Sequence, residues 1–369
     1  MLAAIAVLTA CGPRQAPSSA NSPLSPTPAQ LSNYAVVVSG VQAGDTPTYN
    51  VAIVSTNGQT VASTTAANPN ASSAPWQPLP KVSASASRVY YLDGTNSVKY
   101  LKPDGTTGLA SHLPIQPDER GVFAVSPDDS RIAVSVFNLR SGMRLLVGRV
   151  AASPAWHQVL ATTAVSEWPV GWRGNQLVLA VGYVSGGQQA CAICSLSPIS
   201  YHVVDADTGS RSATVCGAMS PPQLPGGPPS SSGVACATAT KVSSSGLWTE
   251  ESIAVAHWDG SSIPVLRTSC VPSAEPLALS PDGQTLAGER DVNDCGRVTT
   301  ISLFDIHGHG RATAAMTTSY PWIFWIDAGH FCFETDDDRS SILDVAANHI
   351  SGVGAAGLCL ATIPGGLGG

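Results

Sequence analysis

The sequence predicts an all-β protein built as a single β-propeller of four-stranded antiparallel blades. The 369 residues include 35 glycines and 28 prolines, which leave few uninterrupted windows of helical length. The apolar runs are about four to eight residues long, which is typical of strands. A unit of two hairpins also recurs along the chain with a period of about 50 residues, as expected for a repeat architecture.

Residues 276–316 carry the repeat in its most complete form. Its first hairpin turns at the sequence SPDG, residues 280–283. Proline presets φ in such a turn, and glycine supplies the positive φ that closes it. Its second hairpin turns at HGHG, residues 307–310. One four-stranded sheet cannot bury both of its faces, so this unit is expected to pack against copies of itself.

The second hairpin occurs seven times along the chain. The seven copies begin at residues 51, 98, 145, 201, 252, 301 and 340. Seven blades are therefore favoured, with six as the alternative. The first copy lacks an inner strand, whereas an apolar strand at 358–363 remains unused. An open ring would leave strand edges unpaired, so we expect the C-terminal strand to complete the first blade.

The blades resemble the TolB-type and WD-repeat-like propellers of the bacterial envelope. The resemblance rests on the SPDG turn and on the related SPDD turn at 126–129, and it covers residues 33–365. No Gly-His and Trp-Asp pair of a true WD repeat is present. Because these motifs shape the blades, the resemblance implies a fold and leaves the activity open.

The N-terminus resembles a bacterial lipoprotein signal. Residues 1–10 are apolar and end in Leu8-Thr9-Ala10 before Cys11. The resemblance implies cleavage before Cys11 and attachment of a diacylglyceryl group to its sulfur, so we expect palmitate among the lipids of the mature protein. The alternative is a chance cysteine, because no Lys or Arg precedes the short apolar run. A Pro- and Ser-rich tether at 11–32 follows, then the propeller at 33–365 and a Gly-rich tail at 366–369.

An even number of cysteines follows Cys11, which suits disulfides in an exported protein. They are Cys191, Cys194, Cys216, Cys236, Cys270, Cys295, Cys332 and Cys359. Pairing nearest neighbours gives Cys191–Cys194, Cys216–Cys236, Cys270–Cys295 and Cys332–Cys359. The third pair is favoured because both members lie in connections on the same face; Cys236, Cys332 and Cys359 are alternatively buried thiols. Cys191 and Cys194 lie in a Gly/Ser/Pro-rich loop, which favours a structural staple over redox or zinc chemistry.

Two acidic loops in equivalent positions of adjacent blades form a candidate ligand face. The residues are Asp291, Asp294, Asp336, Asp337 and Asp338. Neither loop has EF-hand spacing, so solvated loop charge is the alternative and no metal site is predicted. His307 and His309 supply too few ligands for a metal and are interpreted as turn residues.

Two stretches bring tryptophans together at the entry to a blade. Trp168 and Trp172 belong to one, and Trp322 and Trp325 to the other. These rings either stack on sugars or fill the space between twisted blades, and packing is the favoured interpretation. The links 185–200 and 218–233 are predicted to contact partners because of their length.

The charge pattern and the motifs narrow the function. A net charge of −7 with 18 Lys and Arg residues argues against nucleic acid. No Gly-x-Ser-x-Gly elbow, P-loop or dinucleotide fingerprint is present, so neither an enzyme nor a cofactor is predicted. We therefore expect a monomeric, lipid-anchored, extracytoplasmic, non-catalytic propeller that binds a protein, peptide or glycan of the bacterial envelope. The alternative is a carbohydrate or lactone lyase or hydrolase that uses acidic groups at the central channel.

Overall fold

The computed structural model describes most of the chain from Asn33 onwards. The described residues are 33–40, 46–68, 82–117, 119–138, 142–183, 198–217, 223–225, 227–242, 244, 248–268, 277–288, 300–316, 323–335 and 339–367. They form 28 strands, and these ranges contain no helix. No helix within them is therefore long and apolar enough to cross a membrane.

The strands form seven four-stranded antiparallel sheets, and each sheet is called a blade. The blades are numbered in chain order, and the strands of each blade are given from the innermost to the outermost. Blade 1 contains β28 (Leu358–Ile363), β1 (Tyr34–Ser39), β2 (Thr48–Ser55) and β3 (Thr60–Ala67). Blade 2 contains β4 (Val82–Ala84), β5 (Val89–Asp93), β6 (Ser97–Leu101) and β7 (Thr107–His112). Blade 3 contains β8 (Arg120–Val125), β9 (Arg131–Asn138), β10 (Gly142–Arg149) and β11 (His157–Thr162).

The remaining four blades follow in chain order. Blade 4 contains β12 (Val165–Arg173), β13 (Gln176–Tyr183), β14 (Ser200–Asp205) and β15 (Arg211–Val215). Blade 5 contains β16 (Gln223–Pro225), β17 (Val234–Val242), β18 (Trp248–Ala256) and β19 (Ser262–Thr268). Blade 6 contains β20 (Ala278–Leu279), β21 (Thr285–Gly288), β22 (Thr300–Asp305) and β23 (Gly310–Met316). Blade 7 contains β24 (Ile323–Asp327), β25 (His330–Thr335), β26 (Arg339–Asp344) and β27 (His349–Ala356).

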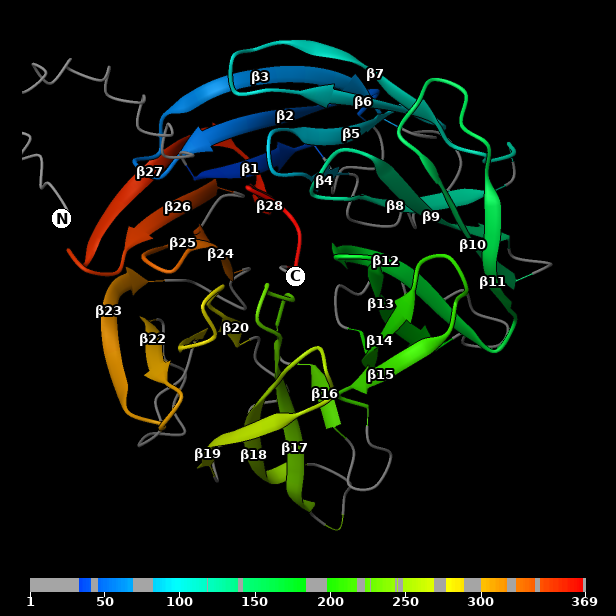
Figure 1. The fold of residues 1–369 in the computed structure, drawn as a ribbon. Coiled ribbons are helices and arrows are strands. Elements are labelled where there is room, and N and C mark those ends of the chain that lie inside the picture. Colours follow the sequence, from blue (N-terminus) through cyan, green and yellow to red (C-terminus); the bar gives the residue numbers. More distant parts are fainter. Residues whose placement is uncertain are drawn as a thin grey trace, which may run out of the picture. The chain divides into compact units, whose positions relative to one another are not determined.

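The seven blades stand around a common centre, which confirms the predicted seven-bladed propeller (Figure 1). The C-terminal strand closes the ring as predicted. β28 pairs antiparallel with β1, so Tyr34 lies opposite Ile363 and Val38 opposite Leu358. A disulfide between Cys332 in β25 and Cys359 in β28, with a Cα–Cα distance of 6.3 Å, joins this strand to blade 7.

A second disulfide joins neighbouring blades elsewhere in the ring. Cys216, directly after β15, is bonded to Cys236 in β17, with a Cα–Cα distance of 5.7 Å. Two of the four nearest-neighbour pairs therefore form. The other two, Cys191–Cys194 and Cys270–Cys295, lie outside the described residues and stay predictions.

Apolar side chains fill the space between neighbouring blades, and two tryptophans fix the spacing of the inner strands. Trp172 of blade 4 is fully buried and donates its indole N–H to Ala124 O of blade 3 at 3.0 Å. Trp325 of blade 7 donates in the same way to Ala278 O of blade 6 at 2.9 Å. The two indoles occupy equivalent places, and each satisfies its buried N–H on a preceding blade. The packing interpretation holds for both residues.

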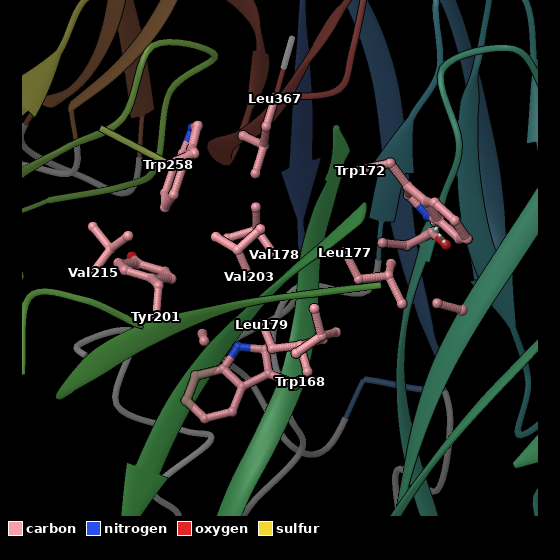
Figure 2. Packing of buried hydrophobic residues seen from close by; sticks show 14 of the residues in the cluster. Trp168, Trp172, Leu177, Val178, Leu179, Tyr201, Val203, Val215, Trp258 and Leu367 are labelled. Carbon is pink, nitrogen blue, oxygen red and sulfur yellow. Dashed lines mark hydrogen bonds between the residues drawn. The ribbon is translucent and has the colours of Figure 1, made fainter. Parts of the chain in front are cut away.

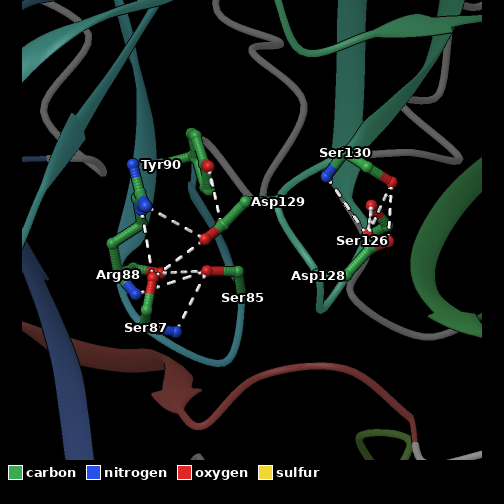
Figure 3. Close-up of polar contacts among 8 residues, drawn as sticks. All are labelled: Ser85, Ser87, Arg88, Tyr90, Ser126, Asp128, Asp129 and Ser130. Atoms are coloured by element: carbon green, nitrogen blue, oxygen red, sulfur yellow. Dashed lines mark hydrogen bonds and ion pairs between the residues drawn. The ribbon is translucent and has the colours of Figure 1, made fainter.

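Figure 3 shows the side-chain contacts of the Ser-Pro-Asp turn of blade 3, a motif that recurs in the chain. Asp128 folds its own turn, because Ser126 Oγ donates to its carboxylate at 2.6 Å and Ser130 N at 3.1 Å. The hydroxyl donors Ser126 and Ser130 hold the pKa of Asp128 below its usual range. The next residue, Asp129, reaches blade 2 and accepts from Tyr90 Oη at 2.7 Å. One short sequence thus closes a hairpin and joins two blades.

The outer hairpins use an aspartate in a similar way. In the 305–310 turn, Asp305 Oδ1 accepts from the backbone N–H groups of His307 at 2.8 Å and His309 at 3.0 Å. Asp205 Oδ1 accepts from Thr208 N at 2.8 Å in the corresponding turn of blade 4. The His-Gly-His-Gly sequence is therefore an ordinary hairpin turn, as predicted.

The stretch 218–233 was interpreted as a link, but the structure places a strand within it. Residues 218–233 contain β16 (Gln223–Pro225), which pairs with β17 as the inner strand of blade 5. A strand that ends in proline gives no periodic signal, and proline is tolerated here because β16 is the channel-side edge of its sheet.

Candidate functional site: the central channel

The inner strands enclose a cavity of about 630 Å³ at the centre of the ring. All seven blades contribute to its wall. The lining segments are 360–362 of β28, 82–84 of β4, 123–125 of β8, 168–171 of β12, 228–231 beside β16, Leu279 of β20 and 324–327 of β24. The residues come from widely separated parts of the chain, so the cavity exists only in the closed ring.

The cavity wall is mainly apolar. Phe123 and Val125 contribute to it from blade 3, Val170 from blade 4, and Phe324 and Ile326 from blade 7. Pro228 and Pro229, which lie in the stretch interpreted as a link, also contribute. Surfaces of this kind bind ligands mainly by burying their apolar parts.

Two carboxylates are the charged groups on this wall within the described ranges, and both are used to build turns. Asp327 Oδ1 accepts from Gly329 N at 2.8 Å and from His330 Nδ1 at 2.9 Å. Its Oδ2 accepts from Asn33 Nδ2 at 3.0 Å, which joins blade 7 to the start of blade 1. Asp282 Oδ1 accepts from Ser280 Oγ at 2.6 Å. No Lys, Arg or His of the described residues lines the cavity.

Hydroxyl groups on the wall connect neighbouring blades. Ser83 Oγ of blade 2 accepts from Val125 N of blade 3 at 2.9 Å. Ser231 Oγ of blade 5 donates to Pro281 O of blade 6 at 2.7 Å. Together with the Asp327–Asn33 contact, these bonds give the cavity a preorganised wall.

The segment that follows β28 also belongs to this site. Residues 364–367 line the cavity, and Leu367 is buried, with 6% of its surface exposed. Leu367 packs into the cluster that contains Trp168 and Trp172 (Figure 2). Sequence reasoning missed this role, because it assigned residues 366–369 to a Gly-rich tail.

The residues predicted as a site are not among those that the structure describes. Cys11 and the five acidic residues Asp291, Asp294, Asp336, Asp337 and Asp338 are outside the described ranges. The acidic face and the lipidation therefore stay predictions. Among the residues that the structure does describe, no group of three or more His, Cys, Asp or Glu side chains could hold a metal ion.

No model of a known protein family matches the chain, and no curated protein matches it. Solved structures do share its fold. An oligogalacturonate lyase in complex with manganese has a TM-score of 0.53 at 10% identity, over 78% of this chain and 80% of that chain. An oligogalacturonate lyase from Vibrio parahaemolyticus has a TM-score of 0.51 at 8% identity, over 82% of this chain and 88% of that chain. TolB from Acinetobacter baumannii has a TM-score of 0.42 at 11% identity, over 90% of this chain and 65% of that chain.

These comparisons correct one prediction. The chain was expected not to be an enzyme, because it lacks the local motifs of hydrolases, P-loops and dinucleotide sites. Both structures above with a TM-score over 0.5 are lyases, so the fold is one that carries enzymes and the prediction is contradicted. Local motifs are a poor guide for a propeller, whose functional groups converge from different blades. At 8% and 10% identity the likeness shows the fold alone and assigns no activity.

Proposed function

We propose that the protein is a lipid-anchored, extracytoplasmic propeller that binds a ligand in its central channel. The ligand is uncharged or positively charged and presents an apolar surface, as an apolar peptide segment of an envelope protein does. The observation that carries this proposal is the wall of the channel, which is mainly apolar and whose described residues include two carboxylates and no basic side chain.

The size and the charge of the cavity support this ligand class. A volume of about 630 Å³ lies within the usual range for small-molecule and short-segment sites. Each apolar group buried there stabilises the complex by about 25 cal/mol per Å² removed from water. The carboxylates Asp282 and Asp327 favour a cation and oppose a polyanion. An acidic polysaccharide would meet no positive side chain on the described wall.

The export and anchoring part of the proposal rests on the sequence. Leu8-Thr9-Ala10-Cys11 followed by a Pro- and Ser-rich tether supports acylation at Cys11. The disulfides Cys216–Cys236 and Cys332–Cys359 are typical of proteins in an oxidising compartment. Metabolic labelling with palmitate tests the anchor. The parent chain should take up label and the Cys11→Ser variant should not; equal labelling, or none in either, would contradict it.

Binding in the channel is tested with Nile red, a neutral apolar dye, on the full chain carrying Cys11→Ser, so that attached lipid does not bind the dye. Val170 lies on the channel wall, and Val170→Arg should weaken dye binding at least about tenfold, because a charged side chain fills an apolar cavity. The matched control is Val61→Arg on β3, where the valine is 43% exposed on the outer strand. Equal binding by both variants would refute the channel as the ligand site.

A second candidate function is a lyase or hydrolase acting on a carbohydrate or lactone. It is supported by the fold that the chain shares with the two oligogalacturonate lyases. Among the described residues, Asp282 and Asp327 are the carboxylates on the channel wall that are available to it. Incubation with polygalacturonate and Mn²⁺, followed by ultraviolet absorbance of the unsaturated product, is the test. Product formation that Asp327→Asn abolishes would favour this candidate over the first.

A further inference from the structure

The segment after β28 runs along the inner ends of three successive blades. Gly365 N donates to Ser85 O of blade 2 at 2.7 Å, and Leu367 N donates to Trp172 O of blade 4 at 3.0 Å. Between them, Gly366 lies against Pro127 of blade 3. Figure 1 shows this segment in red, leading from β28 toward β12 at the centre of the ring. A short piece of peptide is thus already bound to the channel wall by hydrogen bonds from its own backbone.

The backbone of this segment lies so close to the wall that side chains are excluded. A Cβ added at Gly365 would be 2.3 Å from Ala84 O. A Cβ added at Gly366, whose φ is +105°, would be 2.5 Å from Pro127 Cγ. Two consecutive positions therefore require glycine, one for space and the other for both space and φ. This path accounts for the Gly-Gly sequence, which a freely solvated tail would not need.

Leu367 is the apolar anchor of the segment. It belongs to the buried cluster that includes Val178 and Val203 of blade 4 and Trp258 of blade 5 (Figure 2). The wall opposite it is made by Gly171, where an added Cβ would lie 2.6 Å from Leu367 Cγ. Blade 4 thus leaves room for a leucine-sized side chain at this point.

We propose that residues 364–367 are an intramolecular occupant of the channel that competes with its ligand, and that this ligand is a peptide with a leucine-like side chain. The inference rests on the proposed channel function and deepens it. Main-chain N–H groups of the peptide bind to the acceptors Ser85 O and Trp172 O. One apolar side chain fills the space beside Gly171. Any peptide with the same features competes for them. The tethered segment acts at high effective concentration. A free peptide must therefore bind with higher affinity, or be present at higher concentration, to displace it.

The test compares three chains, all carrying Cys11→Ser. Leu367→Asp places a carboxylate in an apolar cluster and should release the segment. Leu367→Met keeps the volume and the apolar character and is the matched control. We expect Leu367→Asp to bind Nile red about tenfold more tightly than the parent, while Leu367→Met binds as the parent does. Added Pro-Gly-Gly-Leu-Gly-Gly peptide should displace the dye from Leu367→Asp, and Pro-Gly-Gly-Asp-Gly-Gly should not.

The inference is overturned if folded Leu367→Asp binds the dye with the parent's affinity, or if both peptides displace the dye equally or neither does. Circular dichroism establishes that the variant is folded, and Leu367→Ala replaces it if it is not. Dye binding that responds to Val170→Arg but not to Leu367→Asp would keep the channel as the ligand site and refute the competing segment. The two proposals can therefore fail separately.

Discussion

Gly365 is the residue at which the channel wall and the bound segment come closest. An alanine there would place its Cβ 2.3 Å from Ala84 O, a backbone atom that cannot move without disturbing β4. We expect Gly365→Ala to lower the free energy of unfolding by about 1–3 kcal/mol. The control is Gly352→Ala in β27, where an added Cβ meets no atom within 4 Å. Urea denaturation should find the control within about 0.5 kcal/mol of the parent; equal losses would show that Gly365 is not under this constraint.

Glu119 forms an ion pair with Arg144 in which the carboxylate is buried. It is 5% exposed, and Arg144 Nη1 and Nη2 lie 2.6 and 2.9 Å from its two carboxylate oxygens. Burial by itself would raise the pKa of Glu119, but the hydrogen bonds from Arg144 and Gln116 N, with the charge of Arg144, outweigh it. The pKa of the carboxyl is therefore lower in the folded state than its ordinary value of about 4.3.

The direction of this shift sets the pH dependence. A lowered folded pKa stabilises the protein above the unfolded pKa, and the contribution disappears as the pH falls through the folded pKa. The free energy of unfolding of the parent should thus fall more steeply below about pH 5 than that of Glu119→Gln. At pH 7 that variant should lose about 1–3 kcal/mol, because Arg144 keeps its charge without its partner. Glu250→Gln, which affects a pair with the largely exposed Arg267, should lose less than about 1 kcal/mol. Parallel pH profiles for the parent and Glu119→Gln would contradict the assignment.

At the scale of elements, β28 is the strand whose position decides whether the ring closes. It pairs with β1 through Tyr34–Ile363 and Val38–Leu358, although the two strands lie at opposite ends of the described chain. Truncation after Gly357 removes the inner strand of blade 1 and exposes the edge of β1. We expect a large drop in melting temperature, or no folded protein. Truncation after Leu367 keeps every described residue and should melt with the parent; a Gly357 truncation that does the same would refute closure by β28.

The elements that the sequence predicted well are those with local causes. The outer hairpins were found because a turn such as 305–310 is folded by its own aspartate and is flanked by a short apolar run, as in the six residues of β22. β4 and β16 are three residues each, and their strand character comes from pairing with β5 and β17. No periodicity exists in so short a run. A central channel could be predicted from the sequence. The apolar wall of the channel and the buried position of Leu367 could not, because both depend on contacts between distant blades.

At the scale of the whole molecule, the two described disulfides connect neighbouring sheets at different places in the ring. Cys332–Cys359 fixes β28 against blade 7, in position to pair with β1, and Cys216–Cys236 joins blades 4 and 5. Their sequence separations of 27 and 20 residues are similar. Loop-closure entropy therefore gives both about the same contribution, ~3 kcal/mol. Any difference between them must be local.

Amide hydrogen exchange of the paired Cys→Ala variants measures that local difference. Removing Cys332 and Cys359 should speed exchange in β28 and β1, because β28 is then held to blade 7 by packing and its chain link alone. Removing Cys216 and Cys236 should speed exchange in β15 and β17 and leave β1 protected. Exchange in these strands reports local opening when its free energy is below that of global unfolding. The same exchange pattern in both variants would show that the ring opens as one unit, with no weak joint between β28 and β1.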